Sequence, residues 1–489
     1  MSKKIIVIGS GVSSLSAATY LSKYGYQVTI LEKNKDFGGR ARQLKSNGFI
    51  FDLGPSFYWM PDVFEKYFED FGKKVKDYYK LIRLDPAYKI FFNNKETISI
   101  PGSFEKILKT FENIEEGSSA KLKKFIKEAE INYSIAMNGI VYKPGFSIFE
   151  LITLQTVKRV KYFITTIKAE VSKIFKNKKL KKILEFPILF LGAKPENTPA
   201  FYNIMNYADF KLGTWYPEDG MYTVIKAMVR LAEENGVKLI SNQNVEGIIE
   251  ENNKVIGVIA NGKNTYCDIV VSGADYHHTE FLLNSQKRNY TESYWNKKVF
   301  APSALLFYIG LNKKVRNMQH HNLFFDVDFD KHASAIYDEK KWPDDPQFYV
   351  TVSSISDMKS APENCDSFVV LIPIASGLED NENIRELYLE KVLTRIEEHS
   401  ENKIKDSIIY KKSYCINDFK SDYNSYKGNA YGLANTLFQT AIFKPKLKSK
   451  KIKGLYFTGQ LTVPGPGVPP ALISGKIVSK VVMQDFPNQ

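Results

Sequence analysis

A glycine-rich turn near the start of the sequence has the residue types and the spacing of a dinucleotide site. The apolar run that ends at Ile8 continues into Gly9-Ser10-Gly11-Val12-Ser13-Ser14. The first glycine of such a turn allows a tight bend, and the second lets the main chain approach a pyrophosphate at the start of a helix. Glu32 follows about 20 residues later, where a carboxylate accepts hydrogen bonds from ribose hydroxyls. The turn therefore predicts a bound dinucleotide.

One position departs from the usual fingerprint. Ser14 stands where a third glycine normally packs the helix against the strand, and serine is small enough for that position. The alternative is a helix-capping turn that only looks like a fingerprint, and the position of Glu32 argues against it. A carboxylate at Glu32 would also repel the 2′-phosphate of NADP.

A second glycine turn follows the acid. After Glu32-Lys33, both included in the predicted site, the sequence reads Gly38-Gly39-Arg40. This turn combines close main-chain approach with a guanidinium suited to phosphate, although a β-hairpin turn with an exposed arginine is an alternative. The doublet resembles that of the amine oxidase and carotenoid desaturase superfamily of flavoproteins, where it lies beside the FAD pyrophosphate. Gly54-Pro55-Ser56 resembles a superfamily segment near the flavin, so the resemblance implies FAD as the cofactor.

Two later segments extend the resemblance. In relatives, the main chain at the position of Val245 hydrogen-bonds adenine, although the side chain could equally belong to a strand core. Gly459-Gln460 closes an apolar strand, and Gly467-Val468 opens a helix with prolines in its first turn. In this superfamily the positive end of that helix points at the flavin ring and stabilises negative charge on it. The string from Thr458 to Gly475 resembles carotenoid desaturases in particular.

The resemblance covers nearly the whole chain and implies a carotenoid desaturase of the bacterial phytoene desaturase type. Such an enzyme removes hydrogen from phytoene in successive steps toward lycopene, so its partner is a lipophilic polyene. The alternatives are a later-acting or C30 carotenoid desaturase, a carotenoid isomerase, an amine oxidase, or a non-enzymatic prenyl-binding protein like the GDP-dissociation inhibitors. A covalent flavin link of the amine oxidase kind is disfavoured, because the last cysteine, Cys415, precedes the flavin-facing segment. The electron acceptor, oxygen or a quinone, is left open.

Few polar catalytic residues are expected for this chemistry. Glu150 is a candidate proton acceptor, because an acid occurs in a similar place in relatives. However, Ser147-Ile148-Phe149-Glu150 has the pattern of a helix capping box, which we favour as the reason for the acid. We expect no metal site, since the three cysteines are far apart and the paired histidines are adjacent residues without ligand spacing.

The charge distribution indicates contact with a polyanion. The 489 residues carry a formal net charge of +14. Residues 158–182 hold ten Lys or Arg and one acid, interleaved with apolar residues in a basic amphipathic pattern. We expect residues 145–190 to dock on an anionic membrane surface, with a solvated helix covering the substrate domain as the alternative. Nucleic acid is not expected. No signal peptide or apolar stretch of roughly 18–20 residues occurs, so we expect a cytoplasmic, peripherally membrane-associated protein.

The elements that must position these residues predict an α/β fold. Residues 3–33 form a strand, a turn, a helix and a second strand. We expect a discontinuous Rossmann-like FAD-binding domain of the amine oxidase type, with an inserted α+β substrate and membrane-docking domain. The predicted FAD domain comprises residues 1–70, 215–290 and 425–489, and the predicted substrate domain comprises residues 71–214 and 291–424.

Overall fold

The first layer of the fold is a parallel sheet assembled from distant parts of the chain. The computed structural model describes residues 2–436 and 438–488. The sheet has five strands in the order β19-β13-β1-β2-β9. Its strands are β1 (Lys4–Ile8), β2 (Gln27–Leu31), β9 (Lys238–Ile240), β13 (Ile269–Ser272) and β19 (Leu455–Phe457). β13 and β19 are buried along their whole length, as expected for parallel strands that are covered on both faces.

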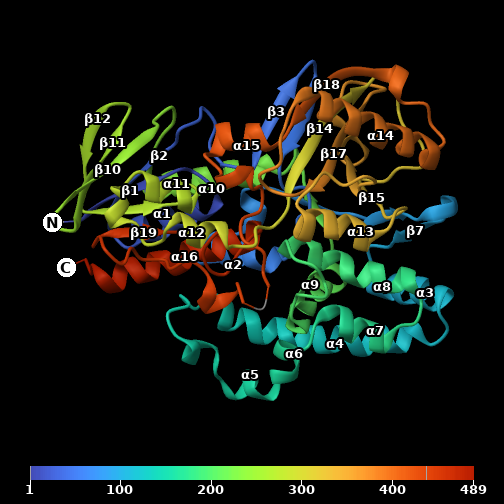
Figure 1. Ribbon diagram of the computed structural model, residues 1–489, viewed down its shortest axis with the longest axis horizontal. Coiled ribbons are helices and arrows are strands. Elements are labelled where there is room, and N and C mark those ends of the chain that lie inside the picture. The colour runs from blue at the N-terminus through green and yellow to red at the C-terminus, as the bar shows by residue number, and fades with distance from the viewer. Residues whose placement is uncertain (1, 437, 489) are drawn as a thin grey trace.

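Alternate residues of β1 pack on the two different covering layers. Ile5 and Val7 belong to the core that includes α1 (Val12–Lys23), α10 (Tyr222–Glu234) and α16 (Val468–Asp485). Ile6 and Ile8 pack instead with the antiparallel sheet of β10 (Val245–Glu251), β11 (Lys254–Ala260) and β12 (Lys263–Tyr266). Figure 1 shows α1 and α16 together on one side of the molecule.

Helices α1 and α16 approach each other very closely. A Cβ built on Gly475 would lie 2.4 Å from the main-chain oxygen of Ser13. The hydroxyl of Ser16 also donates a hydrogen bond to the carbonyl of Leu472 at 2.8 Å. The helix near the C-terminus is therefore fixed beside the N-terminal glycine turn.

The second large layer is a mixed seven-stranded sheet with the order β18-β14-β17-β16-β15-β6-β7. One face packs on α14 (Glu382–Ser400) through residues such as Phe307 and Val392 (Figure 1). The other face contacts Phe49 and Phe51 of the hairpin β3 (Arg42–Ser46) and β4 (Phe49–Leu53). The strands are β6 (Tyr88–Phe91), β7 (Thr97–Ile100), β14 (Ser303–Leu311), β15 (His321–Phe324), β16 (Phe348–Val352), β17 (Asp366–Ile374) and β18 (Ile408–Tyr414).

A helical region lies below the seven-stranded sheet in Figure 1, with α5 at the lower edge of the molecule. Its helices are α3 (Phe104–Ile114), α4 (Ser118–Met137), α5 (Leu154–Lys158), α6 (Val160–Ile164), α7 (Ile167–Ile174), α8 (Lys178–Glu185) and α9 (Ile204–Tyr207). In the described ranges, no helix combines the length and the apolar character needed to cross a lipid bilayer.

Shorter elements connect these layers. They are α2 (Pro61–Glu69), β5 (Leu81–Arg83), β8 (Trp215–Pro217), α11 (Tyr276–Phe281), α12 (Glu292–Asn296), α13 (Phe329–Ser334) and α15 (Ile416–Tyr423). The predicted fold class is confirmed, since a discontinuous Rossmann-like sheet is combined with an α+β insertion. The domain boundaries stay a prediction.

Candidate functional site

The N-terminal glycine turn lies at the carboxyl ends of β1 and β2. Gly9 has a φ of +82°, and its N–H donates to the carbonyl of Leu31 at 2.8 Å. Glu32 follows β2 and is only 4% exposed. Its carboxylate accepts hydrogen bonds from the N–H and the hydroxyl of Ser10, at 2.8 and 2.6 Å, and from the N–H of Asn34 at 2.8 Å. The acid is thus held beside the turn, and its oxygens retain lone pairs for ribose hydroxyls.

The second glycine turn contacts the first. The N–H of Gly38 lies 3.1 Å from both the carbonyl and the hydroxyl oxygen of Ser10. A Cβ built on Gly39 would lie 3.1 Å from the Cα of Gly11, and Gly38 and Gly39 have φ values of +114° and +57°. A Cβ on Gly11 would meet no atom within 4 Å. Gly11 therefore borders open space of the kind that a pyrophosphate needs.

Arg40 is partly buried beside these turns, so it is not the exposed arginine of an ordinary hairpin. Its Nη2 donates to the hydroxyl of Ser425 and to the carbonyl of Asn429, each at 3.2 Å. Burial lowers the pKa of Arg40, and the Asp275 carboxylate opposes that shift. Within the described chain, its buried Nε has no hydrogen-bond partner. Because an unsatisfied buried donor is costly and a phosphate oxygen would satisfy it, these residues fit the pyrophosphate of FAD.

The C-terminal turn and the start of α16 form a further part of the wall, next to the N-terminal turn. The N–H of Gly459 donates to the hydroxyl of Ser474 at 3.0 Å, and the Gln460 amide donates to Asn429 Oδ1 at 3.1 Å. Gly467, with a φ of +113°, immediately precedes α16. Gly467 and Val468 line the cavity, so the positive end of a long helix is at the cavity wall.

These parts surround one cavity of about 470 Å³. It extends from the carboxyl ends of β1 and β2 to the seven-stranded sheet. All but one of the residues predicted to bind the cofactor line it, although their individual roles stay predictions. They are Gly9, Ser10, Gly11, Val12, Ser13, Glu32, Lys33, Gly38, Gly39, Arg40, Gly54, Pro55, Ser56, Val245, Gly459, Gln460, Gly467 and Val468.

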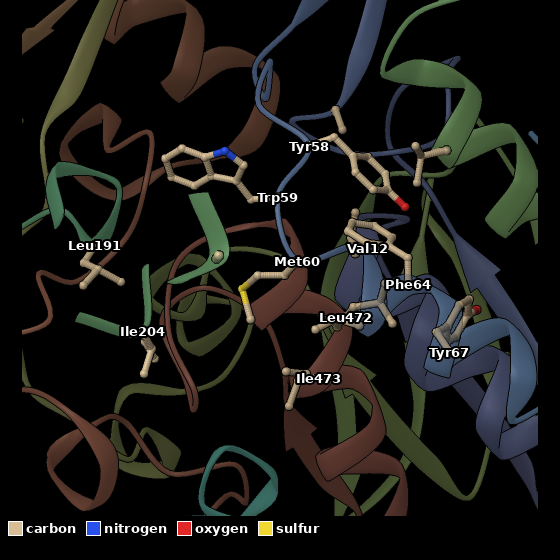
Figure 2. Close-up of a cluster of buried hydrophobic side chains, with 14 of the residues drawn as sticks. Val12, Tyr58, Trp59, Met60, Phe64, Tyr67, Leu191, Ile204, Leu472 and Ile473 are labelled. Atoms are coloured by element: carbon tan, nitrogen blue, oxygen red, sulfur yellow. The ribbon is translucent and has the colours of Figure 1, made fainter. Parts of the chain in front are cut away.

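The other half of this cavity is apolar. Figure 2 shows three of its lining residues within a buried hydrophobic cluster, with Trp59 and Met60 on the segment that follows β4 and Leu191 on another segment. A wall of this kind suits an extended hydrocarbon, because it offers contact area and few polar partners. The apolar lining comprises Trp59, Met60, Phe186, Leu189, Leu191, Met205, Leu323, Phe325, Phe329, Ile336 and Leu371.

Ser14 is the predicted cofactor residue that lies outside the cavity lining. It is fully buried between α1 and the end of β13, and a Cβ built on Gly273 would lie 2.0 Å from its hydroxyl oxygen. Its position is that of the packing glycine in the fingerprint, so it serves helix–sheet contact rather than the cavity surface.

Glu150 also lies outside the cavity lining. The predicted capping box is wrong, because the Glu150 carboxylate binds residues other than Ser147. The Glu150 carboxylate accepts hydrogen bonds from the N–H groups of Gly145, at 2.8 Å, and Phe146, at 3.1 Å. The Ser147 hydroxyl accepts from the N–H of Phe149 at 3.3 Å. Residues 148–151 form a tight 3-10 turn, so the carboxylate reaches past Ser147 to the two residues before it. The Glu150 carboxylate therefore stabilises the conformation of this loop.

The structure brings together a polar pair that the sequence does not reveal. Tyr349 of β16 lines the cavity, and its hydroxyl lies 2.6 Å from Nδ1 of His321 and 3.0 Å from Oγ of Ser56. The antiparallel register pairs Leu323 of β15 with Tyr349, which puts His321 on the same face two residues away. Only the strand register creates this contact, so no local sequence signal could have identified it.

The basic segment 158–182 divides into two parts. Along α7 and α8 the apolar side chains of Ile167, Val171, Phe175 and Leu180 are buried, which favours the alternative of a covering helix for this part, and docking of residues 145–190 stays a prediction. Residues 146–164, which precede α7 and overlap the start of the basic segment, contain eight exposed large apolar side chains. We name them the apolar edge: Phe146, Ile148, Phe149, Ile152, Leu154, Val157, Val160 and Ile164.

Comparison with known proteins identifies the family of this chain. Residues 13–483 match the family of flavin containing amine oxidoreductases. The chain is 40% identical to a carotenoid 3,4-desaturase from Haloarcula japonica over 486 residues, covering 99% of this chain and 98% of that protein. It is 28% identical to a zeta-carotene-forming phytoene desaturase from Myxococcus xanthus over 492 residues, covering 98% and 94% of the two chains.

The fold also occurs in solved structures. An oxidoreductase from Methanosarcina mazei superposes with a TM-score of 0.64 at 17% identity, covering 98% of this chain and 100% of that one. This likeness concerns the fold, whereas the family match and the 40% identity cover nearly the entire sequence. The chain therefore belongs to the flavin containing amine oxidoreductase family, groups there with the carotenoid desaturases, and has FAD as its cofactor.

Proposed function

We propose that this chain desaturates a carotenoid by removing hydrogen from two adjacent carbons of an extended polyene. The observation that carries the proposal is the continuity of the cavity. The residues predicted to bind FAD line one half, and apolar side chains such as Trp59 and Leu191 line the other. A hydrocarbon in the apolar half would therefore meet a flavin in the first half without crossing solvent.

In this proposal bound FAD supplies the acceptor for a hydride. The glycine turns and the Arg40 guanidinium hold its phosphates, and the positive end of α16 stabilises negative charge at the ring. The apolar wall aligns the polyene and excludes water, which is the main requirement for a substrate that offers few groups for polar catalysis.

Two desaturation steps are candidates. The sequence resemblance favours conversion of phytoene toward lycopene. The 40% identity to a carotenoid 3,4-desaturase favours the second candidate, 3,4-desaturation of a carotenoid that is already a long polyene, over the phytoene step. Both reactions would use the same cavity and would differ in which carbons reach the flavin.

The proposal includes docking of the apolar edge on an anionic membrane, where such a substrate dissolves. Phe149, Leu154 and Ile164 are 77%, 83% and 73% exposed, which is unusual for neighbouring apolar side chains on a protein in water. Exposed Lys158 and Lys161 on the same segment would attract anionic headgroups.

A second loop extends this surface. The Lys446 ammonium donates to the carbonyl of Gly145 at 2.7 Å, which joins the loop before β19 to the segment that carries the apolar edge. Phe438 and Phe443 on that loop are 75% and 49% exposed. These contacts support a docking surface formed by both segments.

Expression in two carotenoid-accumulating bacteria tests the proposal. Chromatography should reveal lycopene-series pigments in a phytoene-accumulating strain for the first candidate. It should reveal products with a longer conjugated chain in a lycopene-accumulating strain for the second. The Arg40→Ala variant, which loses the predicted phosphate contact, should form neither. Unchanged pigments in both strains, with soluble wild-type protein, would contradict carotenoid desaturation.

A further inference from the structure

We infer that the hydroxyl of Tyr349 accepts the proton released in desaturation, while His321 takes the hydroxyl proton of Tyr349. The inference rests on the proposed function, because it names the groups that complete the same reaction. Removal of a hydride leaves a cation next to a C–H bond, and that cation becomes an alkene only when a proton leaves. A cavity for this reaction therefore needs a proton acceptor in its apolar half.

The carboxylates that line the cavity are at its nucleotide half. Glu32 binds Ser10, and Asp422 pairs with Arg42. Asp275 contacts the loop around Asn429, beside Arg40. These groups are therefore occupied where the phosphates and ribose are expected, and they do not face the hydrocarbon wall.

The histidine that lines the apolar half is also occupied. His332 lies in the cavity wall, but its Nδ1 accepts a hydrogen bond from the N–H of Gln347 at 2.8 Å. Its Nε2 lies 2.9 Å from the carbonyl of Pro373. Both ring nitrogens are thus engaged with the main chain, which leaves His332 no free position for a substrate proton.

Unlike His332, Tyr349 has a side-chain hydrogen-bond partner, His321, that can take a proton. It lines the cavity beside Ser56 and Phe57, and its oxygen is 2.6 Å from Nδ1 of His321. A hydroxyl has one proton and two lone pairs, and the proton rotates to suit its neighbours. The Tyr349 hydroxyl donates to Oγ of Ser56 at 3.0 Å; when it rotates to donate to Nδ1 of His321 instead, the Tyr349 oxygen keeps its lone pairs for a substrate proton.

His321 is placed to receive a proton from behind the cavity wall. It is completely buried, and burial lowers its pKa well below the usual value, so the resting imidazole is neutral and has one ring nitrogen without a proton. His320 packs edge-on against it at 4.4 Å between ring centroids. The Phe57 ring stacks on His321 with centroids 3.9 Å apart and planes inclined by 13°. An aromatic face in this position stabilises an imidazolium once it forms.

The step balances in atoms and charge. A C–H bond of the substrate cation breaks, and its electron pair becomes the second bond of the new alkene. The released proton bonds to the Tyr349 oxygen, and the former hydroxyl proton of Tyr349 bonds to Nδ1 of His321. The neighbouring carbon has lost a hydride, with two electrons, to FAD. The positive charge therefore ends on His321, opposite in sign to the charge gained by FAD.

Three variants of the holoenzyme test the assignment. Tyr349→Phe and His321→Asn should each lower kcat by about 100-fold or more, as expected for loss of a proton acceptor, with KM and FAD affinity unchanged. An asparagine amide retains a polar group near the place of Nδ1 but accepts no proton. A large loss in His321→Asn therefore marks proton transfer, and near wild-type kcat would overturn the inference. Tyr67→Phe, a matched control whose buried hydroxyl donates to Thr19 outside the cavity lining, should retain activity.

Nitrogen NMR of histidine-labelled protein provides a readout that does not depend on turnover. The chain has six histidines, and the signal absent from His321→Asn identifies His321. That signal should shift in Tyr349→Phe and remain in place in Tyr67→Phe. An unchanged signal in Tyr349→Phe would overturn the pairing. Wild-type protein that desaturates no carotenoid would overturn the proposed function and the inference with it, whereas fully active Tyr349→Phe would overturn the inference alone.

Discussion

The hydroxyl of Ser14 occupies the space that a side chain on Gly273 would need. A Cβ built on Gly273 would lie 2.0 Å from the Ser14 oxygen and 3.3 Å from its Cβ. Ser14 is on α1 and Gly273 follows β13, so the extra atoms on the helix are matched by a missing side chain on the sheet. The serine that replaces the third glycine of the fingerprint thus fits because Gly273 has no side chain.

We expect Gly273→Ala to lower the free energy of unfolding by about 2 kcal/mol, because it overpacks this contact. The double variant Ser14→Gly/Gly273→Ala should recover most of that loss, since it removes the opposing hydroxymethyl group. Denaturant unfolding of the three proteins measures both effects. A double variant no more stable than Gly273→Ala would contradict the size matching.

The nucleotide half of the site was predictable because short runs of sequence determine it. Gly9, Gly11 and Gly39 act through main-chain turns, and a turn depends on its own residues. The pair of Tyr349 and His321 was not predictable, because the register of β15 and β16 creates it.

The exposed surface was predictable only in part. Residues 158–182 have one continuous basic and apolar pattern, yet Ile164 is exposed and Ile167 is buried. The side chain of Ile167 lies in the hydrophobic core with Val171 and Leu180, whereas Ile164 is the last residue of the short helix α6 and lies at the surface. Such a difference depends on which neighbours arrive from elsewhere in the chain, and periodicity does not contain that information.

Glu32→Ala should weaken FAD binding by about tenfold to 100-fold, the effect of losing one or two hydrogen bonds to a charged group. It should also release the N–H and hydroxyl of Ser10, which the carboxylate now holds. Quenching of flavin fluorescence during titration measures the affinity. An unchanged Kd would show that the ribose does not bind at Glu32.

Glu150→Gln should retain most of the desaturase activity. The carboxylate lies outside the cavity lining and accepts hydrogen bonds from Gly145 and Phe146, and a glutamine oxygen can accept one of them. Steady-state kinetics with the carotenoid substrate provides the measurement. A large fall in kcat in a variant that is folded and binds FAD would instead make Glu150 the proton acceptor.

The double variant Leu154→Ser/Ile164→Ser should bind anionic liposomes about tenfold more weakly, because it removes two exposed apolar side chains from the docking surface. High salt should weaken binding of the wild-type chain as well, since exposed lysines contribute to it. Met358→Ser is the matched control, because Met358 is 86% exposed and lies outside the apolar edge. Equal sedimentation of wild type and double variant would exclude the apolar edge as the docking surface.

Asp209 should give the stability of the chain a measurable pH dependence. Burial raises its pKa to about 7, and the Tyr88 hydroxyl donates to it at 2.7 Å. Because the folded pKa lies above the unfolded value, the contribution of Asp209 is full below about pH 4 and is lost as the pH rises through 7. From pH 4 to 8, the unfolding free energy of the wild type should therefore fall relative to Asp209→Asn by up to about 4 kcal/mol. A difference in unfolding free energy between the two proteins that stays constant with pH would contradict the raised pKa of Asp209.

The central claim is that one cavity holds FAD and a carotenoid in contact. Anaerobic addition of a carotenoid to the purified holoenzyme, followed by visible absorbance, tests it most directly. We predict that the flavin band bleaches while the carotenoid bands move to longer wavelength as a double bond is added. A colourless protein that takes up no FAD, or a flavin band that stays unchanged with every carotenoid offered, would contradict the claim.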